Sequence, residues 1–252
     1  MIVSSKIETE EILMEITGKE TKTKRWEKEP SEYHVSDVKK ETLERYLRYA
    51  EEYGGRTFPS DSPKAVLTSL GLREGDALLN AGAAVFVESG MNALEINHYA
   101  TDYTITNTYN RHSTGSILTL AHEAVRYVID SMDWRVEFDG SIERKEFPEV
   151  PVSAVQKAVM DAFARRDIES EKAVRLTFFK NFIDIWSPGA DRKNNPLIAG
   201  VLTFSKMGQT EITDECQKAG VRVEYSSDPS GFTIRFWRHC GKEWAWPANP
   251  YL

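Results

Sequence analysis

Residues 151–167 constrain this chain most, because they predict one amphipathic helix that leads directly into a hairpin. The apolar residues recur at helical spacing and Ser153 can cap the helix after Pro151. Two strands are predicted next, at 174–179 and 182–186, with a tight turn at 180–181 between them. The second strand ends in Ser187-Pro188-Gly189, whose last two residues suit a turn. The predicted buried stripe of the helix consists of Val155, Val159, Ala162 and Phe163.

Periodicity predicts further elements along the chain. Helices are predicted at 8–17, 63–71, 114–132, 197–202 and 210–218. A further helix is predicted to begin at a cap formed by Ser36 or Asp37 and to end at about 52. Strands are predicted at 94–99, in a pair spanning 134–147 that turns at Asp139-Gly140, and in a terminal hairpin at 221–225 and 232–237. The apolar run 77–87 is predicted to be rich in strand, and 101–110 to be strand or loop. The sum is an α+β protein with helices on one face of a mixed, largely antiparallel sheet.

Composition excludes several classes of protein. The 252 residues carry 40% hydrophobic side chains and a formal charge of −7, which argues against a broad phosphate-binding surface. No apolar run approaches the ~20 residues that span a bilayer, and the start lacks a secretory signal pattern, so no membrane partner is expected. Only Cys216 and Cys240 are present, which favours a reduced, cytoplasmic setting.

A series of short segments has the order of motifs found in one protein family. Pro151–Asp167 aligns without a gap with the family pattern PEEALREALVNALAHRD, and Ile183–Gly189 is similar to IEIVSPG. Three shorter segments match further family patterns: Leu79–Phe86 matches the strand TNAALLLF, His98–Asp102 matches RYxGTD, and Asn195–Ala199 matches RNPLIA. Trp26-Glu27 and Cys216–Gly220 are two smaller matches. On these residues the chain resembles the RecG-like C-terminal domain, a divergent GHKL-type ATPase, of Schlafen/Alba-linked transcriptional regulators.

The resemblance implies a domain plan and a ligand. Residues 1–60 would be a helical linker left from the junction to an absent Schlafen/Alba domain, through which DNA could be contacted. Residues 61–148 would form an α/β middle region, 149–240 a degenerate GHKL (Bergerat)-like ATP-binding domain, and 241–252 an irregular tail. The implied cofactor is ATP or ADP with Mg²⁺. The pocket residues carried over from the family are Lys157, Asp161, Arg165, Asp167, Ser187 and Gly189, with Asp161 as the metal ligand.

Two positions depart from the chemistry of the family. Lys157 occupies the place of the Glu that activates water, and an ammonium that is protonated at neutral pH cannot accept a proton. Asp161 replaces the Asn that holds Mg²⁺ and could still ligate the ion. Alternatively, Lys157 and Asp161 form a solvated i, i+4 ion pair with each other. The Gly-rich phosphate turn expected after Gly208 is also missing, which argues against tight triphosphate binding.

Ordinary structural roles compete with the functional roles assigned to these residues. Arg165-Arg166-Asp167 is also a normal helix end, where cations are favoured, and Ser187-Pro188-Gly189 is equally a structural turn. His122-Glu123 begins like the zinc-binding motif His-Glu-x-x-His, but Arg126 stands where the second histidine is needed. No P-loop motif supports helicase chemistry. The tail 235–246 mixes cations with aromatic residues, which suits either packing and oligomer contacts or single-stranded nucleic acid.

Three functions therefore follow. The favoured one is a catalytically inactive regulatory or interaction module on a degenerate nucleotide-binding scaffold, with a protein partner or a second copy of itself. The second is an active Mg²⁺-dependent ATPase that uses Asp161 and a substitute base such as Asp167. The third is nucleic-acid binding through Arg235, Arg238 and Lys242 of the tail.

Overall fold

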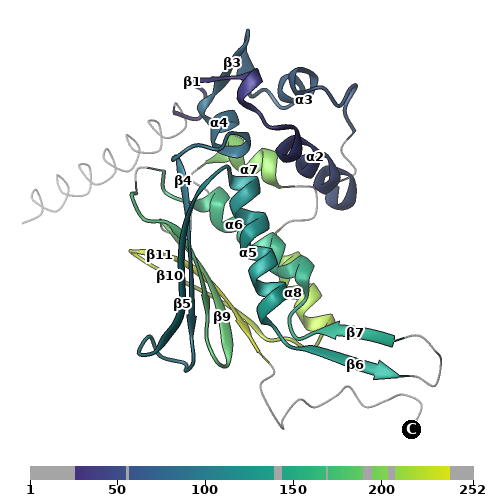
Figure 1. Ribbon diagram of the computed structural model, residues 1–252, viewed down its shortest axis with the longest axis vertical. Coiled ribbons are helices and arrows are strands. Elements are labelled where there is room, and N and C mark those ends of the chain that lie inside the picture. Colours follow the sequence, from purple (N-terminus) through teal and green to yellow (C-terminus); the bar gives the residue numbers. More distant parts are fainter. Residues whose placement is uncertain are drawn as a thin grey trace, which may run out of the picture.

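A computed structural model describes residues 26–54, 57–138, 144–168, 170–189, 195–203 and 208–238 (Figure 1). These residues contain seven α-helices and eleven strands in an α+β arrangement, as the sequence predicts. A single hydrophobic core runs through them from Val38 to Phe236. Within the described ranges, no helix has the length and the apolar character that crossing a bilayer would require.

The main sheet has six strands in the order β10-β11-β9-β8-β4-β5. All neighbours pair antiparallel except β4 and β8, which run parallel. The parallel pair joins a strand from the first half of the chain to one from the second half, so both halves share one sheet. The strands are β4 (Asn92–Tyr99), β5 (Asn107–Gly115), β8 (Val174–Phe178), β9 (Phe182–Pro188), β10 (Val223–Asp228) and β11 (Gly231–Trp237).

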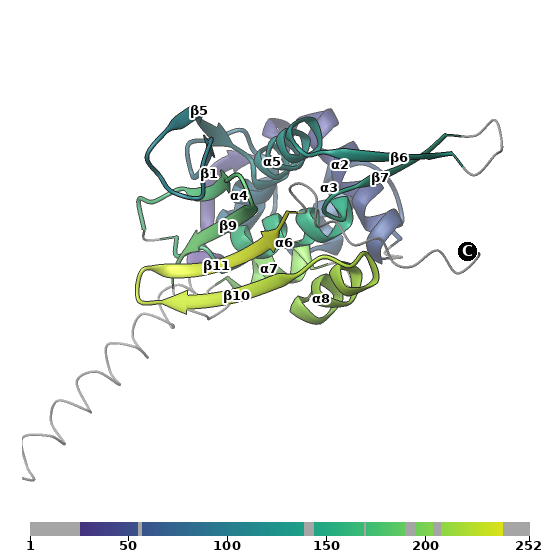
Figure 2. The ribbon, with the colours of Figure 1, turned by 90° about the horizontal axis from the view of Figure 1, so that it is seen from below.

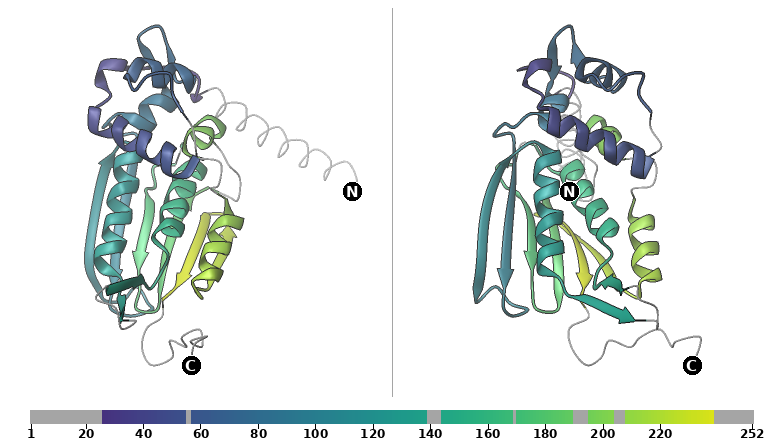
Figure 3. Two further views of the ribbon diagram at one scale, coloured as in Figure 1. Left: turned by 90° about the vertical axis from the view of Figure 1, so that its right-hand side faces the viewer. Right: turned by 45° about the vertical axis from the view of Figure 1, so that its right-hand side comes forward.

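Three helices cover one face of this sheet, as Figures 1 and 3 show: α5 (Ile117–Ser131), α6 (Val152–Arg165) and α8 (Gln209–Lys218). The Ser116 hydroxyl accepts the Thr119 N–H at 3.1 Å and so caps α5. Alternate strand residues such as Leu94, Ile96 and Ile185 point at the helices and are buried. The predicted layer arrangement is therefore confirmed.

A smaller layer lies at one end of the molecule (Figure 1). It contains a three-stranded sheet in the order β1-β3-β2 together with four helices. At the opposite end, a separate hairpin of β6 and β7 extends away from the body (Figure 2). The bounds are β1 (Pro30–His34), β2 (Arg73–Glu74), β3 (Ala77–Leu79), α2 (Lys40–Tyr49), α3 (Pro63–Ser69), α4 (Asn80–Phe86), α7 (Pro196–Leu202), β6 (Trp134–Phe138) and β7 (Arg144–Pro148).

The prediction for 77–87 was wrong in its main part. Only Ala77–Leu79 is strand, and Asn80–Phe86, which the family pattern marks as strand, forms helix α4. Every residue of α4 from Ala81 to Phe86 is buried, so the segment shows no amphipathic period. A short apolar run of this kind fits a buried helix as well as a buried strand.

Two predicted helix caps were also wrong. Asp37 accepts the His34 N–H at 2.7 Å in a preceding 3₁₀ turn, and α2 begins later, after Lys39, without a side-chain cap. Ser153 lies inside α6, whose N-cap position is Pro151. The predictions for 8–17, for the Asp139-Gly140 turn and for 241–252 fall outside the described residues.

Candidate functional site

Helix α6 places Lys157, Asp161 and Arg165 four residues apart on the same side of the helix. All three are buried, at 5%, 8% and 6% exposure. The helix packs against α5, α7, α8 and β9, which leaves little of its surface in water. Buried charges are stable only when partners satisfy them, so the partners of these three side chains define the site.

Lys157 pairs with Glu215 of α8, and the ammonium donates to its Oε1. Glu215 also accepts the Ser153 hydroxyl at 2.7 Å through Oε2. This arrangement corrects the alternative in which Lys157 and Asp161 form a solvated pair with each other, because the ammonium is buried and its partner comes from another helix. The ion pair therefore ties α6 to α8.

Asp161 pairs with Arg165 of the same helix. The Arg165 Nε donates to Asp161 Oδ2 at 2.5 Å, and both side chains are only 7% exposed. The Arg165 guanidinium also lies over the Phe232 ring at 4.4 Å from its centroid, a cation–π contact with β11. The carboxylate that the resemblance assigns to Mg²⁺ is thus held by a guanidinium.

The remaining three predicted residues lie near the C-terminal end of this helix. Ser187 is fully buried and is the register partner of Phe232, whose ring the Arg165 guanidinium covers. The Asp167 N–H donates to the Pro188 carbonyl at 2.8 Å, and Gly189 follows in a left-handed conformation with φ of 107°. The six residues that the resemblance selects are therefore brought into one region.

One cavity beside this cluster is small. A cavity lined by Lys157, Met160, Asp161, Ala164, Leu202 and Thr203 has a volume of about 10 Å³. That volume is close to the minimum for one water molecule, whereas sites for cofactor-sized ligands occupy ≈300 Å³ or more. Among the described residues, no group of three His, Cys, Asp or Glu side chains is arranged to hold a metal ion.

Sequence reasoning missed three contributors to the site. Glu215 and Phe232 lie far along the chain from α6, and no local pattern predicts their contacts with Lys157 and Arg165. Asn195 was noted only as part of a motif, yet it is fully buried, and its Nδ2 donates to the carbonyls of Ala164 and Arg166 at 3.3 and 2.6 Å. It therefore closes the end of α6.

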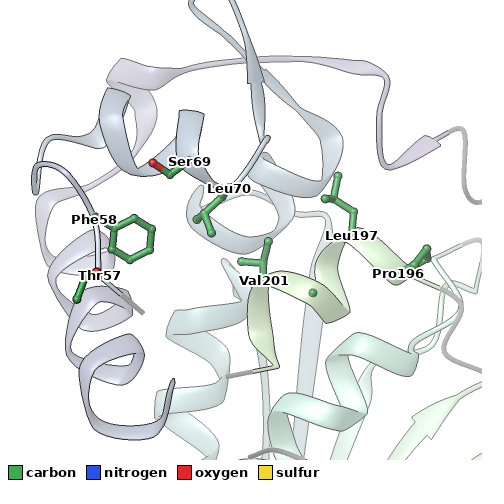
Figure 4. A pocket seen from close by; sticks show the side chains of 8 residues that line it. Thr57, Phe58, Ser69, Leu70, Pro196, Leu197 and Val201 are labelled. Carbon is green, nitrogen blue, oxygen red and sulfur yellow. The ribbon is translucent and has the colours of Figure 1, made fainter. Parts of the chain in front are cut away.

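A larger hollow lies away from this cluster, beside α3 and α7 (Figure 4). Its volume is about 430 Å³ and none of its lining residues has a titratable side chain. The lining residues are Thr57, Phe58, Ser69, Leu70, Pro196, Leu197, Gly200 and Val201. None of the six residues that the resemblance selects lines this hollow.

Comparison with known proteins finds a similar fold among solved structures. No family model matches the chain, and no curated protein matches it. Among solved structures, the chain is similar to the DIP2311 protein from Corynebacterium diphtheriae, with a TM-score of 0.64 and 15% identity. The match covers 84% of this chain and 47% of the other, so the chain spans about half the length of that neighbour. At this identity the likeness shows a shared α+β fold.

Proposed function

We propose that this protein is a regulatory or interaction module built on a nucleotide-binding type of scaffold, without hydrolytic activity. Two ion pairs on α6 carry the proposal: the part-buried Lys157–Glu215 pair and the buried Asp161–Arg165 pair. They occupy the two positions where the resembled ATPases place a general base and a metal ligand. Binding Mg²⁺ at Asp161 would disrupt its buried ion pair with Arg165, and disrupting a buried pair is costly.

Exposed apolar side chains support a role in protein contacts. Tyr103 and Ile105, in the loop between β4 and β5, are 70% and 82% exposed. Trp134 and Phe147, on the protruding β6–β7 hairpin, are 40% and 38% exposed. Large aromatic residues are enriched at protein interfaces. The proposed partner is another protein or a second copy of this chain, and DNA would be contacted only through a further domain.

Titration of the full chain with ATP and ADP, with and without Mg²⁺, tests the proposal. We expect no saturable heat and no phosphate release. The double variant Lys157→Glu/Glu215→Lys places an acid at the base position while keeping opposite charges together. We expect it to fold and to remain inactive. Phosphate release by the wild-type chain that disappears in Asp161→Ala would contradict the proposal.

A second candidate, nucleotide binding after the cluster opens, has one observation in its favour. Ser187 Oγ and Asn195 Oδ1 are buried near the end of α6 and have no hydrogen-bond partner among the described residues. Buried polar atoms of this kind often mark a missing water or ligand. Saturable Mg²⁺-dependent ATP binding that weakens in Ser187→Ala would favour this candidate over the first.

A further inference from the structure

The face of the six-stranded sheet opposite the helices carries a second candidate site. Strand register aligns side chains on this face in rows across β4, β8, β9 and β11. One row holds Glu95, Arg175, Trp186 and Thr233, and the next holds Asn97, Thr177, Asp184 and Arg235. Together with Tyr99, Phe179 and Thr104, most of these residues line a groove of about 310 Å³.

The charges in and beside the groove neutralise each other. Arg175 lies 3.5 Å from Glu95, and Arg235 donates to both oxygens of Asp184 at 2.7 Å. Each carboxylate therefore has its own guanidinium. A ligand with a strong charge of either sign would meet an opposite charge that is already paired, so charge complementarity favours a neutral ligand.

Hydrogen-bonding capacity nevertheless remains in the groove. Each Asp184 oxygen accepts one bond from Arg235 and keeps a further lone pair. Thr177, at the floor of the groove, is 6% exposed, and its hydroxyl makes no hydrogen bond to the described residues. A hydroxyl that lines a groove and has no partner among the described residues is available to a polar ligand.

Aromatic rings stand on either side of these polar groups. The Trp186 indole lies beside Gly231, where a Cβ would come within 2.5 Å of its Nε1, and the Arg175 guanidinium lies 4.6 Å from the ring centroid. In the row beyond Thr177, the rings of Tyr99 and Phe179 are stacked with centroids 5.4 Å apart. Trp186 and Tyr99 are both partly exposed and both line the groove.

We propose that this groove binds an uncharged saccharide of one or two rings. A sugar combines many hydroxyl groups, which suit carboxylate, guanidinium and threonine partners, with C–H faces that pack on aromatic rings. The volume of the groove lies at the lower end of the range for small-molecule sites. Single-stranded nucleic acid fits less well, because its phosphates need unpaired cations. The site lies on the other side of the sheet from α6, so it stands independently of the proposed function.

The test uses the full chain on an immobilised array of neutral mono-, di- and trisaccharides, followed by calorimetric titration with the sugars that bind. We expect saturable binding that changes little from low to high salt. Thr177→Val keeps the shape of the side chain and removes its hydroxyl, and we expect it to weaken binding about tenfold. Asp184→Asn should weaken binding by at least as much. Thr114→Val, an exposed position on β5 outside the groove, should bind like the wild type.

Three results would overturn the proposal. The first is the absence of binding to any sugar on the array. The second is sugar binding that Thr177→Val and Asp184→Asn both leave unchanged. The third is the binding of a single-stranded oligonucleotide in place of sugars, with steep salt dependence and with loss in the same variants. Thr177→Val keeps the test decisive if Asp184→Asn fails to fold.

Discussion

Cys216 shows how burial controls the chemistry of one side chain. It lies on α8 with no solvent exposure, and burial, aided by the neighbouring Glu215, raises the pKa of its thiol to about 12. The thiolate is the reactive form of cysteine, so the native protein should resist thiol reagents at pH 8. We expect Cys240→Ser, which leaves Cys216 as the single cysteine, to be labelled by a disulfide reagent only after denaturant is added. Rapid labelling of the folded variant would contradict this expectation.

Glu27 connects the start of the described chain to a helix 170 residues later. Its carboxylate is 1% exposed and accepts the N–H groups of Leu197 and Ile198 at 3.0 and 2.8 Å, at the start of α7. Burial raises the pKa of Glu27 above its ordinary value of 4.5, although the two N–H groups oppose the shift. Between pH 4.5 and the folded-state pKa, the folded protein therefore keeps a proton on Glu27 that the unfolded chain has released.

A raised pKa gives Glu27 a defined effect on stability. Its contribution is fully present below pH 4.5 and is lost as the pH rises through the folded-state pKa. We expect the unfolding free energy of the wild type, relative to Glu27→Gln, to fall as the pH rises above 4.5. Urea unfolding across this range measures the difference. Glu32→Gln, at an exposed position, should show no comparable slope.

At the scale of elements, two helical glycines should respond in opposite ways to alanine. A Cβ on Gly82 of α4 would lie 2.7 Å from the Leu72 carbonyl oxygen, whereas a Cβ on Gly200 of α7 would meet no atom of the described residues within 4 Å. We expect Gly82→Ala to destabilise the protein by about 1–3 kcal/mol, because a backbone atom must move. Gly200→Ala should stabilise it by up to ~1 kcal/mol through helix propensity. Thermal or denaturant unfolding of both variants provides the comparison, and equal effects would contradict it.

The elements also show where sequence patterns succeed. The apolar stripe of α5, the position of helix α6 and the turn residues of the β8–β9 and β10–β11 hairpins are local signals, and the structure confirms them. The prediction that α6 is amphipathic was wrong, because Lys157, Asp161 and Arg165 are buried together with its apolar stripe. Helix α4 was mistaken for strand because a fully buried segment has no polar face to reveal its period. The Lys157–Glu215 and Arg165–Phe232 contacts join residues 58 and 67 positions apart, and no local pattern encodes them. The residues of the site were therefore predictable one by one, but their partners were not.

At the scale of the whole molecule, the shared sheet bears on how the chain unfolds. The predicted boundary between 61–148 and 149–240 runs between β4 and β8, which pair in parallel over five residues from Leu94↔Val174 to His98↔Phe178. Helices α5 and α6, from opposite sides of that boundary, pack against each other and share one core. Separating the two regions would expose the edges of both strands and the apolar faces of both helices.

We therefore expect the described body of the protein to unfold as one cooperative unit. Far-UV circular dichroism and tryptophan fluorescence should give coincident denaturation curves, because Trp26 packs against the core and Trp186 lies on β9 of the shared sheet. Phe163→Ala, which empties a fully buried position on α6, should shift both curves together by about 3–5 kcal/mol. Phe147→Ala, on the exposed hairpin, should shift them little. Two resolved transitions, with only one moved by Phe163→Ala, would show instead that the two regions fold separately.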